Sequence, residues 1–312
     1  MSETGAAHLA RISNGGKRAL AGALSQIEAA PDDPGIADLL DAAAAAPRGF
    51  SLGLTGPPGV GKSTLTDALV RAMRTDGKSV AVIAIDPSSM RTGGALLGDR
   101  TRLITDPTDA GVFIRSMAAR DRLGGVAEIT FPAMVLMRAL YDLVVVETVG
   151  VGQSETEIAE TTDLVAYCAQ PGSGDALQFM KSGIMEVPDL IVVTKADMGP
   201  VAVRAVSDLK GALSLSSAGE VPVLSCSAST GDGIAQVLHE ICTIAAELSP
   251  RFAESRRSAL NSWSDSQIRM RFGTIGLRLV AEASVDKSRY GSFSDVLRDR
   301  NRLSEALTAA FQ

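Results

Sequence analysis

The sequence has little of what would place it among secreted, membrane or nucleic-acid-binding proteins. Its only cysteines are Cys168, Cys226 and Cys242, and an odd number of widely spaced thiols argues against a disulfide framework. We expect them to be buried and reduced. There is no run of about 18 apolar residues to span a bilayer and no continuous apolar signal segment in the first thirty residues. These absences predict a cytoplasmic protein without a membrane partner.

The chain also lacks an excess of positive charge. Lys and Arg number 30 against 36 Asp and Glu, a net charge of −6, so no overall basic field predicts DNA or RNA as a partner. Hydrophobic residues make up 46% and charged residues 21%, which excludes a mainly disordered chain. The 312 residues allow two domains or one large domain with extensions.

The composition changes twice along the chain. Residues 1–48 are rich in alanine and predict a helical N-terminal extension. Between 49 and 248, short apolar runs alternate with amphipathic stretches, which is typical of β-α-β units. Residues 249–312 are rich in Arg and Ser and predict helices, which either pack back on the same domain or form an arm for dimerisation or partner binding.

The middle segment therefore predicts an α/β domain with a mostly parallel sheet and helices on both faces. Short, apolar or β-branched runs mark the strands. We expect strands at Ser51–Thr55, Val80–Ile85, Leu143–Glu147, Asp163–Ala169, Leu190–Thr194 and Val221–Cys226.

A phosphate-binding pattern follows the first of these strands. Residues 56–64 read GPPGVGKST and match G-x-x-x-x-G-K-[ST], between a strand and a helical pattern. The glycines let backbone N–H groups converge on phosphate oxygens at a helix N-terminus. Lys62 would neutralise phosphate charge, and the hydroxyl of Ser63 would bind Mg²⁺. The predicted phosphate-binding residues are Gly56, Gly59, Val60, Gly61, Lys62, Ser63 and Thr64.

Acidic residues end two further strands. Glu147 is followed by Thr-Val-Gly150, a segment that resembles the D-x-x-G of GTPases with Glu in place of Asp. The backbone N–H of Gly150 would approach the γ phosphate. Asp86 ends another strand, where it would hold the Mg²⁺ shell or orient the attacking water. We therefore take Ser63, Asp86 and Glu147 as candidate metal residues.

The hydrolytic machinery is only partly indicated. Lys62, Asp86 and Glu147 are the candidate catalytic residues. Ras-like enzymes place a water-orienting Gln directly after the glycine of D-x-x-G, and here Val151 fills that position. We therefore expect slow intrinsic hydrolysis. Asp86, Gln153 and groups delivered by a loop or a partner remain alternatives for positioning the water.

A base-reading pattern follows the next strand. Residues 194–197 read T-K-A-D, where GTPases carry N-K-x-D. Asp197 would accept from the N1–H and N2 amine of guanine, groups that adenine lacks, and this favours GTP over ATP. A later S-A-S-T-G-D-G segment, at 227–233, resembles the S-A-x-x-G-x-G whose backbone contacts guanine. Thr194, Lys195, Asp197, Ser227 and Ala228 are thus the predicted base-side residues.

Taken together, these motifs look like one family, the MeaB/ArgK-type GTPases, which are G-protein chaperones associated with methylmalonyl-CoA mutase. The resemblance covers about residues 36–240. It is carried by Gly56–Thr64, Asp86–Ser89, Arg91–Gly94, Gly98–Arg102, Leu123–Val126, Glu147–Glu155 and Pro171–Lys181. It implies a P-loop NTPase fold with a SIMIBI-class G domain and helical extensions at both ends.

The resemblance also implies a function. A member of this family would bind an adenosylcobalamin-dependent acyl-CoA mutase, gate the loading of intact cofactor and use GTP hydrolysis to release damaged cofactor. Mg²⁺ and GTP or GDP would bind this chain, and adenosylcobalamin only the partner. Asp99–Arg102, Gly150–Glu155 and Asp175–Lys181 would form three switches. A C-terminal helical arm would join a homodimer.

Other functions are open to a chain with these motifs. A metallochaperone GTPase for hydrogenase or urease maturation shares the phosphate loop and an E-T-x-G segment. It would need metal ligands, whereas this chain has two histidines and no C-x-x-C. Asp197 argues against a transport-coupled ATPase. A module that holds GTP without hydrolysing it is a further alternative.

Overall fold

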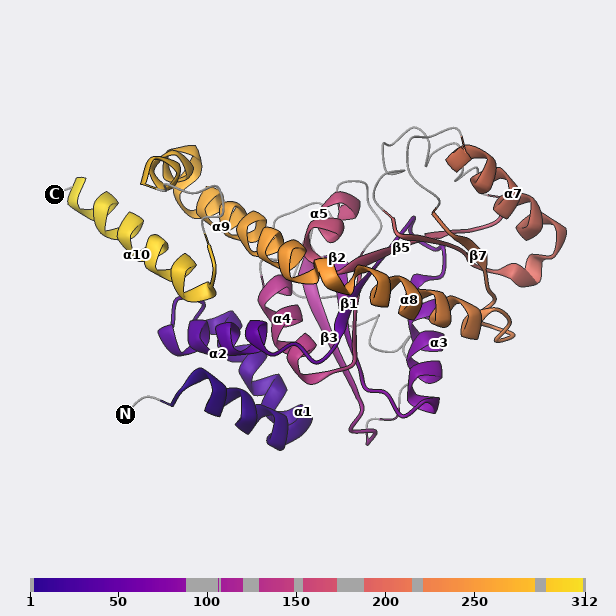
Figure 1. Ribbon diagram of the computed structural model, residues 1–312, viewed down its shortest axis with the longest axis horizontal. Coiled ribbons are helices and arrows are strands. Elements are labelled where there is room, and N and C mark those ends of the chain that lie inside the picture. Colours follow the sequence, from indigo (N-terminus) through magenta and orange to yellow (C-terminus); the bar gives the residue numbers. More distant parts are fainter. Residues whose placement is uncertain are drawn as a thin grey trace.

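The structure is a computed structural model that describes residues 3–87, 106, 108–119, 129–148, 154–172, 188–214, 221–283 and 290–310. Its centre is a seven-stranded sheet in the order β3-β2-β4-β1-β5-β6-β7, in which the neighbouring strands run parallel (Figure 1). The strands are β1 Phe50–Thr55, β2 Val80–Pro87, β3 Val112–Ala119, β4 Leu143–Glu147, β5 Leu164–Ala169, β6 Leu190–Val193 and β7 Val223–Ser225.

Helices lie on both faces of the sheet and at both ends of the chain. They are α1 Gly5–Ala29, α2 Pro34–Ala45, α3 Lys62–Thr75, α4 Thr130–Leu140, α5 Ser154–Thr161, α7 Pro200–Ser214, α8 Ile234–Leu248, α9 Phe252–Ala283 and α10 Phe293–Ala310. Short 3-10 turns occur at η3 Ala196–Met198 and η4 Ser249–Arg251. The predicted α/β class, with helical extensions at both ends, is confirmed.

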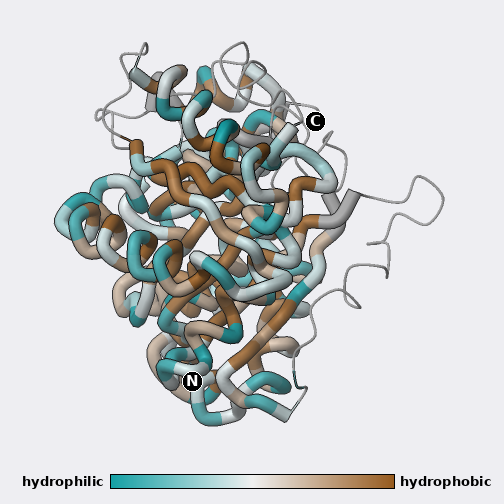
Figure 2. The backbone as a smooth tube through the Cα atoms, turned by 90° about the vertical axis from the view of Figure 1, so that its right-hand side faces the viewer, coloured by the Kyte–Doolittle hydropathy of each residue, from teal (hydrophilic) through white to brown (hydrophobic). Residues whose placement is uncertain are grey.

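The strands bury both faces because alternate side chains point to opposite sides of a sheet. In β4, Leu143 and Val145 join the cluster under α3 and α8, whereas Val144 and Val146 join the cluster on the other face. Figure 2 shows the resulting hydrophobic strands crossing the centre of the molecule. This double burial explains why the strands appear in the sequence as continuous apolar runs.

All six predicted strands are present, with ends that shift by a few residues. Asp163 and Thr194 lie just outside β5 and β6. Strand β3 was not predicted. It lies at the edge of the sheet and pairs with β2 alone among the described strands. Its apolar run is interrupted by Arg115 and Ser116. An edge strand that tolerates polar residues gives a weak apolar signal.

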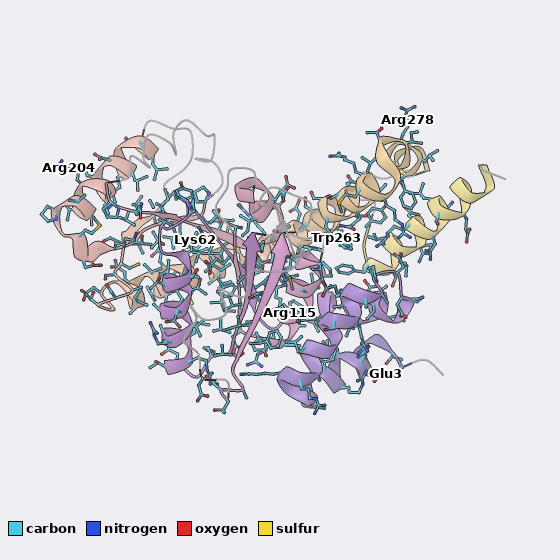
Figure 3. The ribbon with its side chains drawn as sticks, turned by 180° about the vertical axis from the view of Figure 1, so that it is seen from behind. Glu3, Lys62, Arg115, Arg204, Trp263 and Arg278 are labelled. Carbon is cyan, nitrogen blue, oxygen red and sulfur yellow. The ribbon has the colours of Figure 1, made fainter. Side chains whose placement is uncertain are left out.

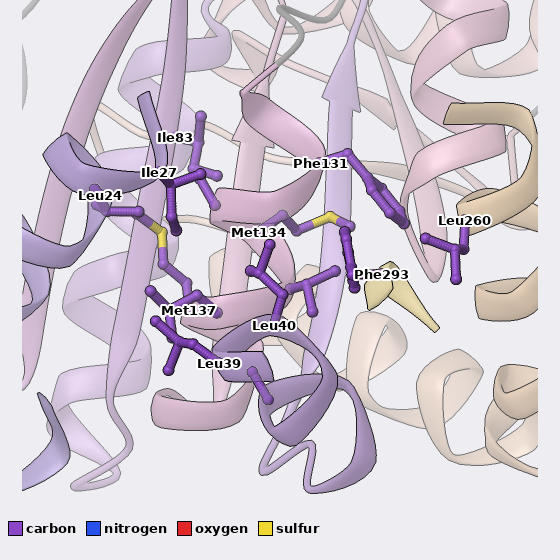
Figure 4. Packing of buried hydrophobic residues seen from close by; sticks show 14 of the residues in the cluster. Leu24, Ile27, Leu39, Leu40, Ile83, Phe131, Met134, Met137, Leu260 and Phe293 are labelled. Atoms are coloured by element: carbon purple, nitrogen blue, oxygen red, sulfur yellow. The ribbon is translucent and has the colours of Figure 1, made fainter. Parts of the chain in front are cut away.

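The helices of the two chain ends share one core with a face of the sheet. Leu24 of α1, Leu39 of α2, Ile83 of β2 and Met134 of α4 belong to the same buried cluster as Phe293 of α10 (Figure 4). The N-terminus of α10 is also capped by α2, because the carboxylate of Asp41 accepts the backbone N–H groups of Phe293 and Ser294 at 2.5 and 3.2 Å. The C-terminal helices thus pack back on the chain's own body.

The cysteine prediction is partly wrong. Cys168 and Cys226 are buried, and burial raises the pKa of both thiols, that of Cys226 to about 11. Cys242 is exposed instead, because α8 buries the stripe that includes Ile241 and Ala245 and leaves position 242 on its outer side.

Within the described part of the chain, we find no helix with the length and apolarity needed to cross a membrane.

Candidate nucleotide site

The phosphate loop connects β1 to α3 at the carboxyl edge of the sheet. Gly56 and Gly61 adopt φ angles of 136° and 106°, a region that side-chain-bearing residues rarely occupy. A Cβ atom on Gly56 would also lie 2.3 Å from the carbonyl oxygen of Cys168 in β5. The loop therefore curls tightly against the neighbouring strand and turns its backbone toward the N-terminus of α3, which is a favourable position for phosphate.

Lys62 is the first residue of α3, and its side chain folds back over the loop. Its ammonium group donates to the carbonyl oxygens of Gly56 at 2.7 Å and Pro57 at 3.0 Å, and the residue is only 6% exposed. Figure 3 places Lys62 at the end of α3 that adjoins the sheet. The ammonium group thus lies at the phosphate loop, and its neutralising role stays a prediction.

The predicted metal residues Ser63 and Glu147 are in contact. The hydroxyl of Ser63 donates to Oε1 of Glu147 at 2.5 Å, and the hydroxyl of Thr66 donates to Oε2 at 3.3 Å. Glu147 is 8% exposed. A hydroxyl and a carboxylate at a phosphate-binding helix are the hard oxygen donors that Mg²⁺ prefers, so the residues fit this ion.

Asp86 can be placed only by its backbone. It is the second-last residue of β2, one strand away from Glu147 in β4, and Ala84 is the register partner of Glu147. Its position is thus at the same edge of the sheet, while its side chain lies outside what the structure describes. Its assignment to the metal or to water remains a prediction.

The base-side residues meet at the ends of β6 and β7. Asp197 lies in η3, and its Oδ1 accepts the hydroxyl of Ser227 at 2.6 Å and that of Ser229 at 3.4 Å. The hydrogen bond from Ser227 is the main reason that the pKa of Asp197 lies below its ordinary value. The carboxylate is therefore ionised near neutral pH and is held through one of its oxygens. Ala228, between the two serines, is half-buried.

Two side chains connect the base-side segment to the phosphate loop. The hydroxyl of Thr194 donates to the carbonyl oxygen of Val60 at 2.6 Å, and the ammonium group of Lys195 donates to that of Gly59 at 3.0 Å. Lys195 also donates to the side chain of Gln170 at 2.6 Å. The sequence predicted contacts to the base for Thr194 and Lys195. Their bonds to the phosphate loop were not predicted.

Several predicted residues lie outside the described part of the chain. These are Gly150, Val151 and Gln153, together with the candidate switches at 99–102 and 175–181. Of the segment Gly150–Glu155, only the backbone at the start of α5 is described.

The sequence did not predict the contacts that Thr66 makes with Glu147 and Gln170 makes with Lys195. For Thr66, the available signal was its spacing of three residues from Ser63 on one helix.

Comparison with protein families shows which family the chain belongs to. The family model described as "Methylmalonyl Co-A mutase-associated GTPase MeaB" matches residues 20–273. The chain belongs to this MeaB GTPase family. The resemblance stated from the motifs is therefore confirmed, and the P-loop GTPase architecture with it.

Individual relatives agree. A putative GTPase of Caulobacter vibrioides is 40% identical over 233 residues, which cover 72% of each chain. A putative GTPase of Pyrococcus abyssi is 53% identical over 149 residues, but the match covers only 47% of this chain and 46% of the relative. This chain thus spans about half the length of some curated relatives that it matches. A crystal structure titled "LAO/AO transport system kinase" superposes with a TM-score of 0.65 at 28% identity, over 99% of both chains.

Proposed function

We propose that this chain binds and hydrolyses GTP as a chaperone of an adenosylcobalamin-dependent acyl-CoA mutase of the methylmalonyl-CoA type. Binding of GTP is inferred mainly from the direct connection between the phosphate loop and the base-side segment. Thr194 and Lys195, next to the base-reading Asp197, hydrogen-bond to carbonyls of the phosphate loop. One bound guanine nucleotide would span both segments.

In this proposal each residue has a separate task. Lys62 leaves the loop carbonyls to neutralise the phosphates, and Ser63 and Glu147 hold Mg²⁺. When bound, Mg²⁺ would offset the negative charge of the phosphate oxygens. The carboxylate of Asp197 would accept the N1–H and N2 amine of guanine, while Ser227 donates to its Oδ1. Because Val151 replaces the water-orienting Gln, hydrolysis by the chain alone would be slow.

The partner is proposed from the family. Its description names an association with methylmalonyl-CoA mutase. Hydrolysis of GTP would gate loading of adenosylcobalamin onto that mutase and assist removal of damaged cofactor. The cofactor would stay on the mutase throughout. The direct test is single-turnover release of phosphate from GTP, with and without cofactor-loaded methylmalonyl-CoA mutase.

We expect slow release by the chain alone, faster release with the mutase, and none from ATP. A matched assay with Lys62→Ala should abolish release in both conditions. Release that the mutase leaves unchanged would contradict the partner, and release from ATP as fast as from GTP would contradict the base assignment.

We also propose a homodimer formed through α9. Beyond Gly273, whose φ of 65° interrupts the helix, the side chains of Ile275 and Leu279 are 62% and 41% exposed. Arg278 projects from the same stretch (Figure 3). Segment 249–312 carries more Lys and Arg than Asp and Glu, whereas the whole chain has a charge of −6. Within α9, residues 269–279 contain three Arg and no Asp or Glu. An apolar, basic stretch of this kind is suited to the acidic body of a second copy.

Analytical ultracentrifugation tests the dimer. Ile275→Glu with Leu279→Glu should shift the sedimentation coefficient from that of a dimer to that of a monomer. Val203→Glu, at a 71% exposed site on α7, is the matched control and should leave it unchanged. A monomeric wild type would contradict the proposal.

A further inference from the structure

The carboxylate of Glu147 is held by hydroxyl groups from two successive turns of α3. Ser63 and Thr66 are three residues apart and so lie on the same face of the helix. Ser63 belongs to the phosphate loop and approaches Oε1 at 2.5 Å, whereas Thr66 approaches Oε2 at 3.3 Å from one turn further along. Thr66 is 0% exposed. Among the contacts described, its hydroxyl reaches the site through Glu147.

A glutamate at this position needs more support than an aspartate would. Its side chain has an additional rotatable bond, and its terminal torsion has a broad energy minimum. A hydrogen bond to each oxygen fixes the plane of the carboxylate. The shorter bond, from Ser63, is the stronger one, and the longer bond, from Thr66, sets the orientation of the second oxygen. Burial of Glu147 increases the value of both, because a buried carboxylate is costly without donors.

We propose that Thr66 is a positioning residue for the metal-side carboxylate. Its hydroxyl holds Oε2 of Glu147 so that Oε1 faces Ser63 and the magnesium position. This inference rests on the proposed function, because it places a magnesium-bound guanine nucleotide at the loop. Thr66 then contributes to the part of the nucleotide affinity that depends on Mg²⁺ and leaves the remainder unchanged.

The test compares nucleotide affinity with and without the metal. Thr66→Val removes the hydroxyl while keeping the branched shape, and Thr66→Ser retains the hydroxyl. Binding of fluorescent GDP and of a non-hydrolysable GTP analogue is measured in excess Mg²⁺ and in EDTA. We expect Thr66→Val to lose about tenfold of the gain that Mg²⁺ gives, as for a hydrogen bond to a charged group. Its affinity in EDTA and the affinities of Thr66→Ser should match those of the wild type.

Thr75→Val is the control, since Thr75 lies on the same helix and its exposed hydroxyl bonds only to a backbone carbonyl in the contacts described. If Thr66→Val does not fold, Thr66→Cys takes its place. An undiminished Mg²⁺ gain in the variant overturns the inference, and so does an equal loss in EDTA. A wild type that binds no guanine nucleotide overturns the proposed function itself, and one that binds without any Mg²⁺ dependence overturns the metal assignment.

Discussion

The two edges of the central sheet hold their charged groups in different ways. At the amino edge, Asp163 precedes β5 and accepts from Arg256 of α9 at 2.7 and 3.0 Å, from Arg138 of α4 at 3.5 Å, and from the backbone N–H of Ser51 at 2.8 Å. At the carboxyl edge, Lys62 donates to backbone carbonyls and Glu147 accepts from hydroxyls. The first edge pairs a carboxylate with guanidinium groups, whereas the hydrogen bonds described for Lys62 and Glu147 at the second edge run to carbonyl and hydroxyl dipoles.

This difference separates stability from function. Burial alone would raise the pKa of Asp163, but the hydrogen bond from Arg256 and the charges of Arg138 and Arg256 outweigh it, so this pKa lies below its ordinary value. Burial lowers the pKa of Arg138 to about 10. Breaking such a buried group leaves an uncompensated charge. In the proposed function, phosphate and a metal ion would replace the dipoles around Lys62 and Glu147.

The largest expected effect is at the carboxyl edge. Lys62→Ala should lower single-turnover phosphate release by about 1,000-fold or more, because a main electrostatic partner of the transferring phosphate is removed. Thermal unfolding without nucleotide should change little. The matched control is Lys210→Ala, at an exposed lysine of α7. If Lys62→Ala lost stability and kept its turnover, the distinction between the two edges would be wrong.

The opposite edge should give the opposite result. Asp163→Asn leaves the buried guanidinium of Arg138 and the half-buried one of Arg256 without their carboxylate. It should lower the free energy of unfolding by about 3 kcal/mol. Urea denaturation measures this loss. Guanine nucleotide affinity of the folded fraction should stay within about twofold of the wild type, since the change in charge is at the far edge. Asp208→Asn, at an exposed site on α7, is the control.

The same carboxylate predicts how stability depends on pH. Because the pKa of Asp163 is lower in the folded chain than in the unfolded chain, its stabilisation is complete above the unfolded value of about 3.9. It is lost as pH falls through the folded value. Urea midpoints between pH 6 and pH 3 should therefore fall less in Asp163→Asn than in the wild type. Parallel curves would show that Asp163 is not the titrating group.

Base selection comes next in size. Asp197→Asn should weaken GTP by about 30-fold, the range of a lost hydrogen bond to a charged group, and favour xanthosine triphosphate, whose C2 oxygen accepts from the new amide. Competition binding with both nucleotides measures the change. Asp232→Asn, in the same base-side region but bonded to Thr230, is the control. An unchanged preference would remove Asp197 from the base site.

At both edges, the sequence predicts contacts within a short segment better than contacts between distant segments. Lys62, Ser63 and Asp197 could be proposed from sequence because a phosphate loop and a base-reading turn are made by neighbouring residues whose spacing is fixed. The bonds of Thr194 to Val60 and of Arg256 to Asp163 join residues far apart in sequence, and only the folded chain brings them together. Strand β3 was missed for a related reason, since an edge strand is defined by its partner and little by its own polarity.

The smallest expected effect concerns the helical layer rather than either edge. Asp41 of α2 caps α10 through the backbone N–H groups of Phe293 and Ser294. Asp41→Ala should lower the free energy of unfolding by about 1 kcal/mol, the usual cost of losing a helix cap. Asp41→Asn retains an acceptor oxygen and should recover most of it. A loss near that of Asp163→Asn would mean that α10 is held mainly by this cap. The expected small loss would show that it is held mainly by the apolar contacts of Phe293 with Phe131 and Trp263, whose ring centroids lie 6.0 and 5.4 Å away.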